Sequence, residues 1–215
     1  MVATVVNLTS ASVTVHYFRR EGLGPNRPAN ENEDYYAHDE HRKASRWRGS
    51  GAAALGLRGH VEPGEFRRVL QGYVPGTDIR LGRLRDGAHE HRPGLDITLS
   101  APKSVSLEAL LGGSDRAMRA HDAAVRATLD FIETRLLRTR RWSPEERRSV
   151  QVNAPLLVAA TFRHVTSRNN DPQLHTHCVI GQHDTGCRSA ALCDCLPPVA
   201  VTDRRKGYEQ MAPGV

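Results

Sequence analysis

Residues 162–180, FRHVTSRNNDPQLHTHCVI, decide the fold because they join two strand patterns through a run of turn-forming residues. The first pattern, LLVAATFRHVT at 156–166, is rich in β-branched residues, and the second is LHTHCVIGQ at 174–182. Between them SRNNDPQ favours a turn. We therefore predict an antiparallel hairpin.

This hairpin would bring three histidines together. His175 and His177 are two positions apart, so on a strand they share one face, and His164 would lie opposite them. Three neutral imidazoles offer a half-open shell for a divalent cation, with positions left for water or substrate. The alternative is three ordinary polar residues of a surface or core, because a pair of histidines around one residue is by itself a weak signal.

A metal-binding histidine needs an acceptor for its second ring nitrogen, and the candidate is Asp96 in the strand pattern GLDITLS. Cys178 would point to the opposite strand face, which argues against a thiolate ligand.

The remaining pattern predicts an α+β fold with a mostly antiparallel sheet. We expect a strand at 2–8, a strand at 95–99 and a long helix from Asp115 to Arg138 with Ser114 as its N-cap. Shorter elements are a helix or turn at 10–22, a flexible run at 25–34, a short helix ending at Gly56, a helix within 62–72, a hairpin or loop at 79–93, a helix or turn at 101–113 and a short helix starting in 143–148.

Composition indicates a globular chain suited to a polyanion. Hydrophobic residues make up 39% and charged residues 25% of the 215 residues, and the formal net charge is +6 with a pI near 9.5. Nucleic acid is one fitting partner, although many mildly basic proteins bind none. The sequence has no apolar run long enough for a membrane span and no secretory signal pattern, so we expect a cytoplasmic location.

All four cysteines lie near the end of the sequence, and their spacing fits no common zinc finger, so we interpret them as free thiols: Cys178, Cys187, Cys193 and Cys195. Residues 182–215 lack sustained periodicity. We therefore predict one domain over 1–181 and a divergent tail over 182–215, without regular structure.

A metal beside a polyanion suggests phosphodiester chemistry, for which tyrosine can serve as a nucleophile. The sequence offers Tyr17, Tyr35, Tyr36, Tyr73 and Tyr208. A free phenol has a pKa of about 10 and needs a metal or a base to lose its proton at neutral pH. Adjacent tyrosines such as Tyr35 and Tyr36 are more often two aromatics packed in a core.

Two long segments, FRHVTSRNNDPQLHTHCVI and GLDITLSAPKSVSLEALLGG, resemble the relaxase domain of the TrwC/TraI type, the MobF group of conjugative relaxases. DYYAHD, RWRGSGAAALGL and AHDAAVRATLDFIE occur in the family's order, and the resemblance covers residues 1 to about 180. These proteins belong to the histidine-hydrophobic-histidine (HUH) endonucleases.

The resemblance implies a five-stranded antiparallel sheet with helices, a ferredoxin-like or palm-like core, incomplete at the C-terminus. It implies metal-dependent nicking of single-stranded DNA at a plasmid transfer origin through a 5′-phosphotyrosine, a reversible transesterification in conjugation. Tyr17 would attack first, with Tyr35 as the later-acting tyrosine and Tyr36 beside it. The three histidines would hold one Mg, Mn or Zn ion, and Asp96 would orient one of them.

The expected partners are transfer-origin DNA and the family's accessory relaxosome and coupling proteins. We expect five basic residues in or beside the motif segments to contact DNA phosphates, unless they are solvated surface charges: Arg80, Arg83, Lys103, Arg163 and Arg168.

Three features depart from the family pattern. Phe18 follows Tyr17 where many members have a second tyrosine, and Thr176 occupies the hydrophobic position between the paired histidines. The resemblance also fades after Ile180, which suggests a truncated chain. Two alternatives to an active relaxase stay open. One is a remnant that binds metal and DNA without cleaving, and the other is a rolling-circle replication initiator.

Overall fold

The structure is a computed structural model that describes residues 1–8, 44–81, 83–85, 88–153, 156–167, 169 and 171–181. Within 83–90 and 139–142 only the backbone is described. Predictions for 10–22, 25–34 and 182–215 fall outside these residues.

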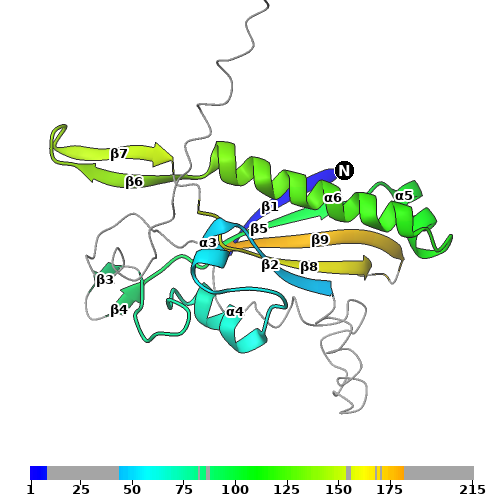
Figure 1. Cartoon of the computed structure of the whole chain (residues 1–215), viewed down its shortest axis with the longest axis horizontal. Helices are drawn as coiled ribbons and strands as arrows, with labels where there is room; N and C mark the ends of the chain where they lie inside the picture. Colours follow the sequence, from blue (N-terminus) through cyan, green and yellow to red (C-terminus); the bar gives the residue numbers. More distant parts are fainter. Residues whose placement is uncertain are drawn as a thin grey trace, which may run out of the picture.

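A five-stranded antiparallel sheet forms the centre of the molecule, as predicted (Figure 1). Its spatial order is β1-β5-β9-β8-β2, and each neighbouring pair is antiparallel. The strands are β1 (Val2–Leu8), β5 (Gly94–Ser100), β9 (Pro172–Gly181), β8 (Ala159–Thr166) and β2 (Ser45–Arg48). The predicted hairpin is confirmed as β8–β9, with His164 directly opposite His175.

The two faces of the sheet pack against different helices, because side chains alternate along each strand. On one face, Val125 and Leu129 of α6 (Asp115–Phe131) pack against Leu99, Cys178 and Ile180 of the sheet. Helix α5 (Lys103–Leu110) packs beside α6 around Leu174, and Figure 1 shows α6 lying along this face.

The other face is covered in part by α3 (Ser50–Ala54) and α4 (Pro63–Leu70). Phe66 of α4 is 1% exposed and lies 5.0 Å, ring centre to ring centre, from Phe162 of β8. Gly49 makes the turn from β2 into α3 with φ of 96°, and a Cβ there would lie 2.1 Å from the carbonyl oxygen of Leu157. This close approach requires glycine.

The long predicted helix is confirmed, with its end corrected. Ser114 Oγ accepts a hydrogen bond from the Ala117 amide, as expected of an N-cap. Helix α6 continues into a π-helical turn, η2 (Ile132–Leu136), and Arg138 begins a strand, not the helix end predicted there.

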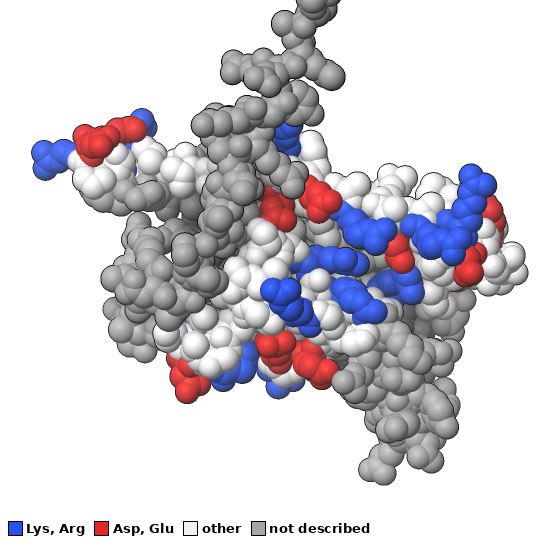
Figure 2. Space-filling model, in the orientation of Figure 1, with Lys and Arg blue, Asp and Glu red and all other residues white. Residues whose placement is uncertain are grey.

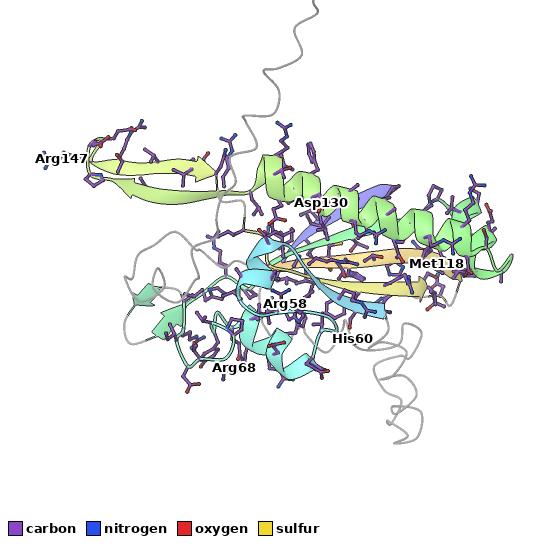
Figure 3. All side chains as sticks on the ribbon, in the orientation of Figure 1. Arg58, His60, Arg68, Met118, Asp130 and Arg147 are labelled. Atoms are coloured by element: carbon purple, nitrogen blue, oxygen red, sulfur yellow. The ribbon has the colours of Figure 1, made fainter. Side chains whose placement is uncertain are left out.

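The short helix predicted in 143–148 is wrong. Those residues join β6 (Arg138–Ser143) to β7 (Arg148–Asn153) in a hairpin that projects away from the sheet, with Arg147 in its turn (Figure 3). Ser143 Oγ accepts from the Glu146 amide, so the side chain read as a helix cap closes a turn instead.

Two further predictions agree with the structure. The segment 79–93 contains a hairpin of β3 (Arg83–Arg85) and β4 (Ala88–Glu90), and 101–113 contains α5. Among the residues described, no helix is long and apolar enough to cross a membrane.

Candidate metal centre

His164, His175 and His177 meet on the sheet face that also carries Phe162 and Val179. All three are buried, and each can offer one nitrogen such that the three nitrogens lie within 4.8 Å of one another. Their ring centres are 5.2–5.3 Å apart. The predicted clustering of the three histidines is therefore confirmed.

Hydrogen bonds set the orientation of two of these rings. Asp96 Oδ2 lies 2.8 Å from His177 Nδ1, and Thr98 Oγ1 lies 3.0 Å from the same nitrogen. The backbone oxygen of Gln173 lies 3.1 Å from His175 Nδ1. Because a carboxylate and a carbonyl can only accept, both imidazoles carry their proton on Nδ1. Their Nε2 lone pairs are then available to a cation.

The donor set fits a divalent metal ion. Metal–nitrogen bonds of about 2.1 Å in a tetrahedral shell place ligand nitrogens about 3.4 Å apart, so nitrogens that lie within 4.8 Å of one another need to approach by up to about 1.4 Å. Three imidazoles leave further coordination positions open, which is the pattern of a catalytic site and not of a closed structural one.

The reverse face of the same strand explains why threonine is tolerated between the paired histidines. Thr176 Oγ1 lies 2.9 Å from Nε2 of His121, a buried residue of α6. Burial lowers the pKa of His121, so this ring is neutral near pH 7. The residue between the paired histidines therefore makes a polar contact with α6.

Cys178 points to the sheet face opposite the histidines, as predicted, and packs there in the core with Leu99 and with Val125 of α6. Burial raises the pKa of its thiol to about 12, which keeps it protonated. It is a free thiol, and the other three cysteines lie outside the described residues.

The basic residues predicted to contact DNA do not form one group. Arg80 donates to the Gln71 carbonyl oxygen and lies over the Tyr73 ring, whereas Lys103 begins α5 and donates to the Pro172 carbonyl oxygen. Arg163 pairs with Asp122 of α6, on the sheet face opposite the histidines. The Arg83 side chain and all of Arg168 fall outside what the structure describes.

The three candidate nucleophiles, Tyr17, Tyr35 and Tyr36, also lie outside the described residues. Among those described, the sequence reasoning missed Thr98. Its signal was present, because Asp96, Thr98 and Ser100 alternate as polar residues along one strand face. The fold and site together define a three-histidine centre on an antiparallel sheet.

Comparison with known proteins supplies the family. The model of the TrwC relaxase family matches residues 11–187, and the chain belongs to this family. A curated relative, the multifunctional conjugation protein TraI of Escherichia coli, is 47% identical over 136 residues, which are 63% of this chain and 8% of that protein.

Solved structures agree. Conjugative relaxase TrwC in complex with oriT DNA is similar in a metal-free form, with 37% identity and a TM-score of 0.64, and in a metal-bound form, with 36% identity and a TM-score of 0.64. Each match covers 84% of this chain and 56% of the solved chain.

Proposed function

We propose that this chain nicks one strand of DNA at a plasmid transfer origin in a metal-dependent reaction of conjugative transfer. The observation that carries the proposal is the buried cluster of His164, His175 and His177, with Asp96 hydrogen-bonded to His177. Similarity to a metal-bound relaxase in complex with oriT DNA supports it. Because the known relatives are conjugation proteins, conjugation is favoured over rolling-circle replication.

In this proposal the three histidines hold one divalent ion, Mg, Mn or Zn. A bound ion supplies Lewis-acid stabilisation of the charge that develops on the phosphate oxygens. Asp96 and Thr98 keep the His177 ring oriented with Nε2 toward the cluster. Neither residue needs to touch DNA, so both act by positioning His177.

Tyr17 is the proposed first nucleophile. Its phenolic oxygen would form a bond to the scissile phosphorus while the bond from phosphorus to the 3′ oxygen breaks, and the phenolic proton ends on that 3′ oxygen. The result is a 5′-phosphotyrosine and a free 3′ hydroxyl, and the reverse reaction rejoins the strand. Tyr35 would act in a later transfer, with Tyr36 beside it.

The proposed partner is single-stranded transfer-origin DNA, with accessory relaxosome and coupling proteins, in the cytoplasm. Arg80, Arg83, Lys103, Arg163 and Arg168 remain proposed phosphate contacts. For single strands, the logarithm of the binding constant should fall with the logarithm of salt by about 0.7 per phosphate neutralised. An affinity for DNA that did not change with salt would remove these contacts from the proposal.

The experiment that tests the proposal is formation of a covalent adduct. Wild-type protein with Mn²⁺ and an oligonucleotide carrying a candidate transfer origin should give a complex that survives denaturation, seen as a shifted band on a denaturing gel. Tyr17→Phe keeps the ring and removes the attacking oxygen, so the adduct should disappear. Tyr35→Phe should leave this first cleavage largely intact.

The opposite pattern, an adduct in Tyr17→Phe but not in Tyr35→Phe, would show that the roles of the tyrosines are reversed. Wild-type protein that binds metal yet forms no adduct on any transfer-origin sequence would refute nicking and leave a metal- and DNA-binding remnant.

A further inference from the structure

A pocket of about 240 Å³ lies on the sheet face opposite the three histidines, between α6 and the edge strand β2. The β8–β9 register fixes the sheet face on which the pocket lies, because Thr161, Arg163 and Thr176 alternate along their strands with residues of the histidine face. Its lining comes from β2 and the residue before it, and from β8, β9 and α6: Ala44, Arg46, Arg48, Asp122, Val125, Thr161, Arg163 and Thr176.

Positive charge dominates this pocket, since three arginines and one carboxylate are among its lining residues. The Arg46 guanidinium also donates to the Ser45 carbonyl oxygen and lies 2.6 Å from His60 Nδ1. The carboxylate, Asp122 Oδ2, lies 2.8 Å from Arg163, and these side chains are 39% and 30% exposed. Arg46 and Arg48 are two positions apart on β2 and therefore project on the same side. Figure 2 shows Lys and Arg side chains gathered over β2 and the neighbouring part of α6.

Neutral hydroxyls complete the lining. Thr161 Oγ1 donates to the Arg46 carbonyl oxygen, and Thr176 Oγ1 pairs with His121. With one carboxylate against three arginines, the lining has an excess of two positive charges that a bound anion would offset. Guanidinium groups bind phosphate oxygens in pairs, a geometry that suits phosphate better than chloride.

The volume of the pocket limits the size of the ligand that it can hold. Sites for drug-sized molecules occupy roughly 300–1,000 Å³, so this pocket suits a single phosphate group and not a whole nucleotide. We propose that it is a phosphate-binding site, separate from the metal centre. The phosphate is either free in solution or part of a DNA backbone, and only the second source rests on the DNA binding that the proposed function includes.

The test is titration calorimetry with inorganic phosphate at constant ionic strength, on metal-depleted protein, so that an ion at the histidines cannot bind the phosphate. Wild type should bind one phosphate per chain. Arg48→Gln should weaken binding by about tenfold or more, the loss expected for one charge-assisted hydrogen bond. Asp122→Asn should strengthen it, because the competing carboxylate charge is gone.

The matched control is Arg119→Gln. Arg119 lies on α6, is 75% exposed, pairs with Asp115 and is not among the residues that line the pocket. Arg119→Gln removes one positive charge, as Arg48→Gln does, and should leave phosphate affinity unchanged. Absence of phosphate binding by wild type would overturn the proposal, and so would equal weakening in Arg119→Gln and Arg48→Gln.

Oligonucleotide binding then distinguishes the two sources. If the pocket holds a backbone phosphate, inorganic phosphate competes with single-stranded DNA, and Arg48→Gln lowers the salt slope by about 0.7 relative to Arg119→Gln. If the ligand is free phosphate, the slopes of the two variants agree while only Arg48→Gln loses phosphate binding. Both results support the site, and neither depends on whether the chain nicks DNA.

Discussion

At the scale of single residues, the hydrogen bond from His177 Nδ1 to Asp96 fixes one ring of the candidate metal centre. Asp96→Asn keeps the shape of the side chain but removes its charge, so the imidazole becomes a poorer ligand. Metal affinity should fall by roughly 10–100-fold, as is usual for such partners of a metal ligand. Calorimetry with Mn²⁺ measures this. An unchanged affinity would show that Asp96 does not orient His177.

Thr176 gives a second prediction, on the other side of the same strand. Thr176→Val is nearly isosteric, but it removes the partner of His121 Nε2. A buried polar group that loses its hydrogen bond costs about 1–3 kcal/mol, so the free energy of unfolding should fall by this amount. Urea denaturation at pH 8 checks it, with Thr128→Val on α6 as the control. A more stable Thr176→Val variant would contradict the argument.

Sequence spacing was sufficient for the four residues of the metal centre, because strand alternation and one turn place three of them and a second strand supplies Asp96. It could not find the bond between His121 and Thr176. That contact joins residues 55 positions apart, on elements whose packing no local pattern records.

At the scale of elements, Glu133 in η2 connects three segments. Its Oε1 accepts from the amides of Ser50 and Leu157 and from the Ser50 hydroxyl. Glu133→Ala should lower the free energy of unfolding by about 1–3 kcal/mol, because these donors lose their acceptor. Glu133→Gln keeps one acceptor oxygen and should lose less. Equal losses in the two variants, followed by urea denaturation, would show that the carboxamide oxygen cannot replace the carboxylate.

Helices and strands were predicted correctly where the sequence pattern was long. The prediction failed where the pairing of strands decides the local structure. The helix of α6 and strands β1, β5, β8 and β9 follow from periodicity. By contrast, Ser143-Pro-Glu-Glu carries signals shared by helix starts and turns, and the β6–β7 pairing makes it a turn. Strand β2 has four residues at the sheet edge, too few for alternation to be visible.

At the scale of the whole molecule, the central sheet separates two candidate binding sites. One face carries the histidines and Asp96, whereas the other carries the arginine pocket beneath α6. From net charge the sequence indicated a polyanionic partner such as nucleic acid, and it named Arg80, Lys103 and Arg163 among the basic residues that contact phosphates. The fold places them on separate elements, because neighbouring motifs along the chain need not share a surface.

The most direct test of the central claim is adduct formation before and after metal removal. Wild-type protein treated with a chelator should lose its denaturation-resistant adduct with transfer-origin DNA and regain it when Mn²⁺ is restored. His175→Ala should bind the oligonucleotide yet form at most a trace of adduct at the same Mn²⁺ concentration. An adduct that persists in chelator, or at wild-type levels in His175→Ala, would contradict a nicking reaction that depends on a metal held by these histidines.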